Sequence, residues 1–359
     1  MQGGPAVSSR TAGLQVSAPR SDRTSVTLLR RLLLPLLLLA LAAPAAAHGE
    51  AFAPPNGKVL NGLTAGYDFD DFTRRAGKAP AVWQHFVAWN GSLGYTVDNT
   101  RKVGARLMYH LGTASGQNLP ERISPGEIAR GKGDAYLIRL TRTIADYGQP
   151  AYIRLMGEMN NCDNAYSSHS CTGGRRDADH SPATFKKAWK RVYLITHGGD
   201  VADVDAALAK RGLPAVQTGA ARIPEAQVAF VWAPMVGGSP NIAALAPGKF
   251  WPGSRWVDWV GTSFYSRFPN WTGLETFYKT WAAGKHKPFA VAEWAMWGAD
   301  TPSFAGRLFD WIASHKRTKM LQYNQGNPSP GTFRLENYPA SARVIKQRLA
   351  HKRFLTRAP

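Results

Sequence analysis

Short runs of β-branched and aromatic residues alternate along the chain with stretches of helical periodicity. Eight runs predict strands, at 63–68, 81–89, 105–110, 151–156, 228–232, 257–263, 289–293 and 320–323. Five stretches predict helices, at 136–147, 185–196, 274–283, 304–315 and 342–349. Ser124 with Pro125 and Glu127, and Ser181 with Pro182, are typical helix starts. This alternation predicts a single-domain (β/α)8 TIM barrel. A doubly wound open sheet is the alternative, although no glycine-rich fingerprint follows an early strand.

The first 47 residues have the pattern of a secretory signal peptide. Arginines precede an apolar stretch at 32–41, and three alanines at 45–47 supply the small residues that a signal peptidase needs. The apolar stretch contains Pro35 and is shorter than the roughly 20 residues of a membrane helix. We therefore expect cleavage near Ala47, an extracellular location and no stable membrane span. A pair of arginines before the stretch leaves the twin-arginine route open beside the general secretory one.

The composition indicates a folded and strongly basic protein. Hydrophobic residues make up 44% of the chain and aromatics 11%, which excludes a disordered polymer. Lys and Arg outnumber Asp and Glu by 44 to 24, giving a formal charge of +20. Basic residues are dense in the predicted helix 342–349 and its tail, which is either a solvated face or a surface that holds an anionic cell-surface polymer. No nucleic-acid-reading module is present, so we expect no such partner, and we expect a monomer.

Cys162 and Cys171 are the two cysteines of the chain. They are too few for a disulfide-built scaffold or a four-thiolate zinc site. Lying nine positions apart in a loop-like segment of an exported chain, they predict a disulfide, with two free thiols as the alternative. Acidic residues and histidines at 169–180 lack a recognised ligand spacing. We therefore expect neither a metal nor another cofactor.

Two predicted strands are mostly apolar, and each has a glutamate at or just after its carboxyl end. The segment 152–160 contains Glu158, and the segment 289–294 contains Glu293. Parallel barrel strands present their catalytic residues at their carboxyl ends. A retaining glycosidase needs two such carboxylates, one as acid and base and one as nucleophile. Arg154 lies on the same strand face as Glu158 by the period of two, and Tyr265 is a candidate to hydrogen-bond the nucleophile.

Four segments resemble the successive strand-end motifs of glycoside hydrolase family 26, a family of retaining (β/α)8 glycosidases. They are IRLMGEMN at 153–160, VWAP at 231–234, VDWVGTSFY at 257–265 and PFAVAE at 288–293, and GKGDAY at 131–136 also matches. The resemblance covers most of 60–325. It implies that 48–359 form a glycoside hydrolase catalytic domain, with Glu158 as acid/base, Glu293 as nucleophile, Tyr265 beside it and Trp232 lining the cleft.

Further strand-end residues complete the candidate substrate contacts: His110, Arg154, Asn160, Trp294 and Tyr323. His110 has the alternative of satisfying a neighbouring carbonyl, and each tryptophan has the alternative of belonging to the core.

One position departs from the family pattern. Mannan-cleaving members usually carry histidine immediately before the acid/base glutamate, where this chain has Gly157, and Asn161 and Cys162 replace a common glycine and tryptophan. The prediction is a secreted retaining hydrolase of a β-linked polysaccharide, foremost an endo-1,4-β-mannanase. The alternatives are a mixed-linkage β-glucanase or xylanase on the same fold, or a carbohydrate-binding protein without catalysis. The sequence assigns no role to 200–224.

Overall fold

The computed structural model describes residues 51–65, 68–326, 328 and 331–359. The predicted signal peptide lies outside these residues. Across the described ranges, no helix is long and apolar enough to cross a membrane.

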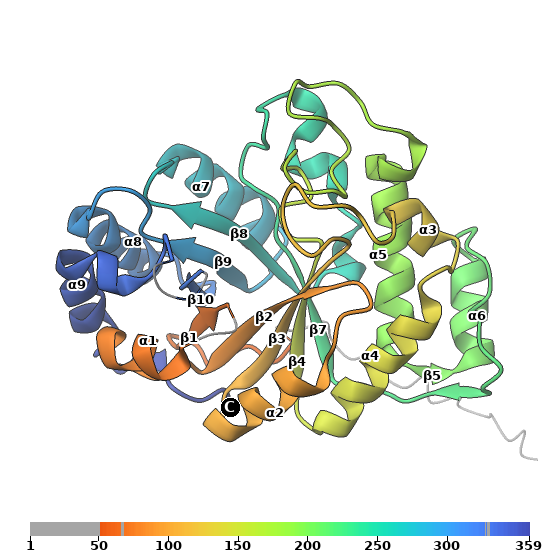
Figure 1. Cartoon of the computed structure of the whole chain (residues 1–359), viewed down its shortest axis with the longest axis horizontal. Helices are drawn as coiled ribbons and strands as arrows, with labels where there is room; N and C mark the ends of the chain where they lie inside the picture. The colour runs from red at the N-terminus through yellow and green to blue at the C-terminus, as the bar shows by residue number, and fades with distance from the viewer. Residues whose placement is uncertain (1–50, 66–67, 327, 329–330) are drawn as a thin grey trace, which may run out of the picture. The chain divides into compact units, whose positions relative to one another are not determined.

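Eight parallel strands close into a barrel, so the predicted (β/α)8 fold is confirmed (Figure 1). Neighbours pair in chain order, and β1 pairs with β10 in register Leu60 with Met320 to complete the ring. The strands are β1 (Val59–Thr64), β2 (Val82–Ala88), β3 (Arg106–Gly112), β4 (Ala151–Leu155), β7 (Val228–Trp232), β8 (Trp259–Tyr265), β9 (Phe289–Ala295) and β10 (Thr318–Asn324).

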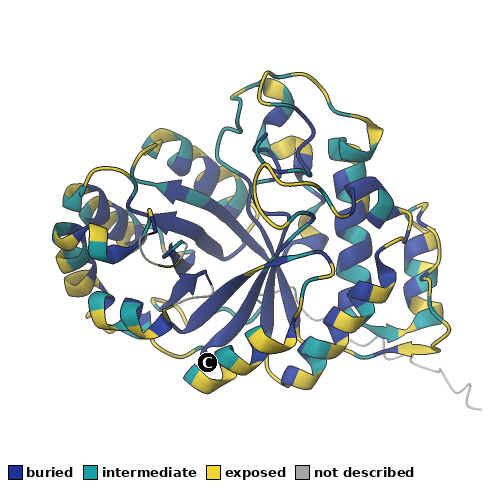
Figure 2. Ribbon diagram, viewed as in Figure 1, coloured by how far each residue is buried: buried dark blue, intermediate teal, exposed yellow. Residues whose placement is uncertain are grey.

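Helices surround the barrel with their buried sides against the strands and their exposed sides outward (Figure 2). The capping box at Ser124 and the cap at Ser181 start two of them, as predicted. The helices are α1 (Phe69–Ala76), α2 (Gly94–Val103), α3 (Pro125–Ala129), α4 (Asp134–Tyr147), α5 (Pro182–His197), α6 (Val201–Ala209), α7 (Trp271–Phe277), α8 (Pro302–Ser314) and α9 (Pro339–Leu349). A π-helical segment, Tyr278–Ala283, continues α7.

Short elements complete the barrel. β5 (Gly199–Asp200) and β6 (Arg222–Ile223) form an antiparallel pair on either side of α6 in the chain. The segment 200–224, to which the sequence assigned no role, therefore contains a helix and most of a two-stranded sheet. β11 (Phe354–Leu355) adds to β1 in parallel. The first predicted strand, 63–68, is displaced, because the observed strand is Val59–Thr64. Asp68 therefore follows the strand in a left-handed conformation at the start of α1.

Side chains alternate between the barrel interior and the layer beneath the helices. The interior cluster takes one residue or more from each strand, among them Leu60, Met108, Val231 and Ala292. Residues 51–53 pack against this cluster at the amino end of the strands. There the Tyr152 hydroxyl donates a 2.7 Å hydrogen bond to the carbonyl of Phe52, which closes this end of the barrel.

A single guanidinium joins the two ends of the described chain. Arg106 donates to the carbonyl of Phe52 at 3.0 Å and also to the carbonyl of Pro359. Positions 52 and 359 therefore lie together at the amino end of the barrel strands.

A β-bulge interrupts β9 just before the glutamate. Pairing with β8 steps from Thr262–Val291 to Ser263–Glu293, and pairing with β10 steps from Leu321–Val291 to Tyr323–Trp294. Ala290 and Ala292 face the interior, so strict alternation would turn Glu293 toward the helices. An extra residue re-aims the side chains that follow it. The bulge thus directs Glu293 into the barrel mouth and Trp294 outward.

Candidate active site

The turn after β4 positions Glu158. Met156 and Glu158 both adopt left-handed backbone conformations, with φ of 44° and 54°. Such angles are uncommon for residues other than glycine and gather at functional sites. The Glu158 amide donates to the carbonyl of Ala233 at 2.8 Å, and Asn161 donates to its carboxylate at 3.1 Å. The strained turn therefore bends the chain so that the glutamate lies across the end of the strand.

Arg154 lies between the two glutamates. Its side chain is fully buried, its Nη1 is bonded to Oε2 of Glu293, and its Nη2 is 3.8 Å from Oε1 of Glu158. Nη2 also donates to Oγ of Ser263 at 2.9 Å. One guanidinium thus contacts both carboxylates, and the structure brings Glu158 and Glu293 together at the carboxyl ends of β4 and β9.

Glu293 accepts hydrogen bonds from three side chains. Besides Arg154, the Tyr265 hydroxyl donates to Oε1, and Nδ2 of Asn324 lies 2.9 Å from the same oxygen. The predicted proximity of Tyr265 to Glu293 is thus present. The sequence analysis missed Asn324, although the alternation of Met320, Gln322 and Asn324 along the last strand would have placed it in the mouth.

Electrostatics separate the two carboxyls. Burial raises the pKa of Glu158, and the negative charge of Glu293 raises it further, while Arg154 opposes both effects. Burial also raises the pKa of Tyr265 well above its usual range, again reinforced by Glu293. These effects shift Glu158 toward the protonated form, as a general acid requires.

His110 is neutral and faces the same mouth. Burial and the charge of Arg154 hold the pKa of His110 well below its usual range. Its Nε2 accepts a 3.2 Å hydrogen bond from the Gly157 amide. The Phe86 ring lies 5.1 Å from the imidazole and is 50% exposed. Phe86, which the sequence analysis also missed, alternates with Val82 and Gln84 and offers an apolar surface beside His110.

Three predicted substrate contacts prove to be core residues. Trp232 is fully buried and donates its indole N–H to the Phe250 carbonyl at 3.2 Å. Trp294 and Tyr323 are 1% exposed, pack on each other and face the helices. They lie on the outward side of their strands, where large aromatic rings fill the layer beneath the helices. The prediction that they bind sugar is therefore wrong.

Asn160 is also structural. It is fully buried, its Nδ2 donates to the carbonyls of Met235 and Leu245, and its Oδ1 accepts from the Met235 amide at 2.8 Å. All its polar atoms are occupied in holding the segment after β7, so the predicted sugar contact is corrected to a loop-fixing role.

Gly157 has no room for a side chain. A Cβ atom there would lie 2.4 Å from Nε and 2.8 Å from Cζ of Arg154. That guanidinium is fully buried and contacts both carboxylates, so displacing it would break these contacts. A histidine at this position, as in the family pattern, would collide with Arg154 where it lies in this structure.

The predicted disulfide is confirmed. Cys162 and Cys171 are bonded, with their Cα atoms 5.0 Å apart, and close the loop after β4. Among the described residues, the group that has the proximity of metal ligands is these two cysteines with Asp163. Its sulfur atoms are occupied by the disulfide.

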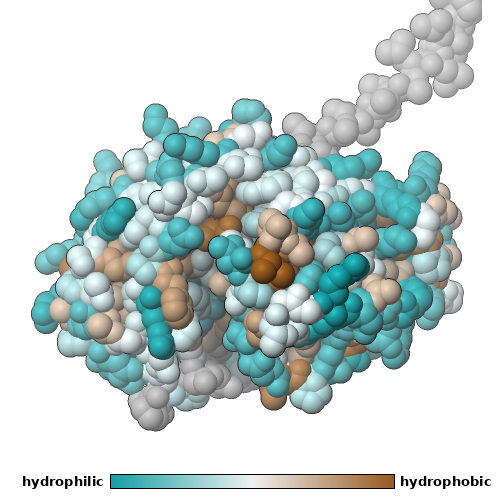
Figure 3. Space-filling model, turned by 90° about the horizontal axis from the view of Figure 1, so that it is seen from above, coloured by the Kyte–Doolittle hydropathy of each residue, from teal (hydrophilic) through white to brown (hydrophobic). Residues whose placement is uncertain are grey.

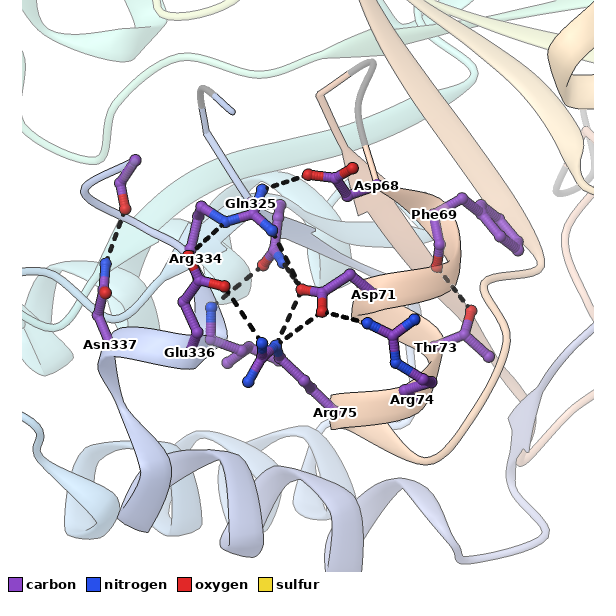
Figure 4. A network of polar contacts seen from close by, with 12 residues as sticks. Asp68, Phe69, Asp71, Thr73, Arg74, Arg75, Gln325, Arg334, Glu336 and Asn337 are labelled. Carbon is purple, nitrogen blue, oxygen red and sulfur yellow. Dashed lines mark hydrogen bonds and ion pairs between the residues drawn. The ribbon is translucent and has the colours of Figure 1, made fainter. Parts of the chain in front are cut away.

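A network of ion pairs supports the rim on the side of β1 and β10 (Figure 4). The Arg334 guanidinium, which is almost fully buried, contacts Asp68 at 2.6 Å, Asp71 at 3.1 Å and Glu336 at 3.0 Å. Arg75 adds contacts to Asp71 and Glu336. The network ties α1 to the segment that follows β10.

This segment carries an aromatic residue to the site. Gln325 follows Asn324 and accepts from the Leu335 amide at 3.3 Å, so the segment folds back over the end of β10. The Phe333 ring then lies 5.2 Å from the ring of Tyr265, the tyrosine that donates to Glu293. The ion pairs of Arg334 thus lie one residue along the chain from Phe333, the ring that packs on Tyr265.

Comparison with solved structures identifies the fold, whereas the sequence matches no protein-family model and no curated protein. A mannanase of Bacillus subtilis is 16% identical with a TM-score of 0.54, covering 87% of this chain and 90% of its own. A modular endo-β-1,4-mannanase of Cellulomonas fimi is 14% identical with a TM-score of 0.55, covering 85% and 76%. The catalytic domain of a family 26 endo-β-1,4-mannanase of a Bacillus species is 11% identical with a TM-score of 0.53, covering 83% and 87%.

These matches define the class of fold as a (β/α)8 barrel of the glycoside hydrolase type. More narrowly, the fold is that of the β-mannanases of glycoside hydrolase family 26, as the sequence motifs predict.

Proposed function

We propose that the protein is a secreted retaining glycoside hydrolase that cleaves a β-linked polysaccharide, with β-1,4-mannan attacked within the chain as its substrate. The observation that carries the proposal is the contact of one buried guanidinium with two glutamates at the carboxyl ends of β4 and β9. Active sites of (β/α)8 barrels lie at this end, and paired carboxylates are the catalytic groups of most glycosidases.

The local environments assign the roles. The raised pKa of Glu158 suits a general acid, which protonates the departing glycosidic oxygen and then activates water. Glu293, held by Arg154, Tyr265 and Asn324, is aimed for attack on the anomeric carbon. A retaining enzyme requires carboxyl groups about 5–5.5 Å apart. Arg154 contacts both carboxyl groups and so keeps them at the same side of the barrel mouth.

Mannan leads among substrates because the structural neighbours are named as mannanases. His110 and Phe86 would contact the sugars, the first by hydrogen bonding and the second by stacking. Export is supported by the amino-terminal sequence pattern and by the disulfide, since disulfides persist in oxidising compartments.

The lack of room for a side chain at Gly157 favours a second candidate for the substrate. Mannan-cleaving relatives usually place a histidine there, and this chain cannot do so without displacing Arg154. The first sugar subsite therefore differs in shape, which favours a mixed-linkage β-glucan or a xylan on the same catalytic pair.

Release of reducing ends from soluble mannan, mixed-linkage glucan and xylan tests the proposal. We expect the parent protein to cleave one of them and Glu293→Ala to cleave none. Glu275→Ala is a matched control, because Glu275 lies in α7 and its partners are Lys279, Trp311 and His315.

The stereochemistry of the first product tests the retaining mechanism. Proton NMR during early turnover should show the β-anomer released first, because two displacements restore the original configuration. An α-anomer released first would refute the assignment of Glu293 as nucleophile. Binding of these glycans without turnover by the parent protein would instead support a non-catalytic carbohydrate-binding protein.

A further inference from the structure

An aromatic cluster extends from the nucleophile to the surface. The Tyr265 ring lies 5.6 Å from that of Trp297, which in turn lies 5.4 Å from that of Phe268. Phe268 is 63% exposed, one of four large hydrophobic residues with prominent exposure in the described chain. Most of the face shown in Figure 3 is hydrophilic or neutral, with brown confined to small patches. Exposed rings continuous with a site are suited to stacking on sugars.

Arg267 places a positive charge on this cluster. Its guanidinium carbon lies 5.6 Å from the centre of the Phe268 ring and 5.3 Å from that of Trp297. The residue is exposed, and within the described part of the chain it makes no ion pair with a carboxylate. Other arginines at the rim, such as Arg334, are instead bound to acidic residues.

The backbone around Arg267 is fixed before any ligand arrives. The Phe268 amide donates to the Tyr265 carbonyl at 3.1 Å, and Oγ of Ser266 accepts from the Trp297 amide at 2.8 Å. This turn couples the end of β8 to the segment after β9.

We propose that Arg267, Phe268 and Trp297 form a subsite for a sugar that bears a carboxylate, a hexuronic acid unit of the glycan. The aromatic rings stack on the sugar and the guanidinium pairs with its carboxylate, for which Arg has matching geometry. The excess of Lys and Arg over Asp and Glu in the chain favours an anionic ligand in the same sense. The proposal rests on the glycan-cleaving function above and narrows its substrate to a charged or partly charged β-glycan.

Paired oligosaccharides test the subsite. The probes are β-1,4-mannohexaose and the same oligosaccharide with its C6 hydroxyls oxidised to carboxylates, titrated calorimetrically into the full chain carrying Glu293→Ala. We expect the oxidised form to bind about fivefold more tightly at low salt, the upper range for an exposed ion pair. The preference should decline as salt is added.

Variants separate a local contact from net charge. Arg267→Gln should abolish the preference, and Arg267→Lys should retain part of it. Arg307→Gln is the matched control, because Arg307 is also exposed and also lies over an aromatic ring, but that of Trp271 rather than those of Phe268 and Trp297. It should leave the preference intact. Equal affinity of the parent site for both probes, or equal losses in Arg267→Gln and Arg307→Gln, would overturn the subsite.

The proposal and the hydrolase function fail in different ways. Cleavage of unoxidised mannan by the parent protein, with no preference for oxidised probes, would remove the subsite and leave the hydrolase standing. Preferential binding that depends on Arg267, with no cleavage of either probe, of mixed-linkage glucan or of xylan, would retain the subsite and remove the hydrolase.

Discussion

Replacing Arg154 with Met tests whether one cation holds the two glutamates together. The Arg154 side chain is fully buried, and those of Glu293 and Glu158 are only 10% and 13% exposed. The substitution keeps a long side chain but leaves two nearly buried carboxylates without their shared cation. Removing one partner of a buried ion pair destabilises a protein by about 3–5 kcal/mol. We expect a loss of that size in the free energy of unfolding at neutral pH.

The loss should depend on pH in a defined direction. The pKa of Glu158 is already raised in the folded protein, and without Arg154 this carboxyl binds a proton still more readily. An unfolded glutamate titrates near pH ~4.3. The folded variant therefore holds more protons than its unfolded chain above that pH, so its stability falls as pH rises. The difference from the parent protein is largest near neutrality and shrinks toward pH ~4.

Urea denaturation at both ends of this pH range measures the effect. Arg191→Met is a matched control, since Arg191 is equally buried but pairs with a single carboxylate, Asp134. Adding Glu293→Gln to Arg154→Met should restore part of the neutral-pH stability by removing one of the two charges. A variant Arg154→Met that is as stable as the parent protein at neutral pH, or whose loss does not change with pH, would refute the reasoning.

Three further predictions concern catalysis and the disulfide. Glu158→Ala should slow cleavage of natural glycans by orders of magnitude but slow aryl glycosides with good leaving groups far less, because only the former need proton donation; equal losses would contradict the role. Gly157→Ala should lower kcat at least tenfold while circular dichroism shows an intact fold, since the new Cβ displaces Arg154; unchanged kcat would show that Arg154 can move without consequence. Replacing Cys162 and Cys171 with Ser should lower the free energy of unfolding by about 2 kcal/mol through the larger entropy of the unfolded loop, and thermal denaturation with unchanged midpoint would contradict this.

Strand number and order were predictable because most barrel strands are rich in apolar, β-branched and aromatic residues. β7 matches its predicted limits, and most other strands differ by at most two residues. The helices α1, α2 and α6 were not predicted, since α1 is highly polar and α2 begins at Gly94 without a side-chain cap. The first strand was predicted too far along the chain, because the observed strand ends at Thr64 and Asp68 is already the N-cap of α1.

The meeting of Glu158 and Glu293 at the strand ends was predictable, but the direction of the neighbouring side chains was not. Glu158 and Glu293 follow apolar runs, which places them at the strand ends whatever the local geometry. Trp294 was misassigned because strict alternation after Ala290 and Ala292 puts it inside, and the bulge that reverses this leaves no mark in the sequence. Arg334 lies far along the chain from Asp68, so no local pattern indicates their ion pair.

The meeting of positions 52 and 359 on one guanidinium has a practical consequence. Both lie at the end of the barrel opposite the two glutamates. A module or surface anchor fused through either position would leave the substrate entrance facing away from its support. A short peptide joining these two positions, with new termini opened in an exposed loop elsewhere, should likewise be tolerated as a circular permutant.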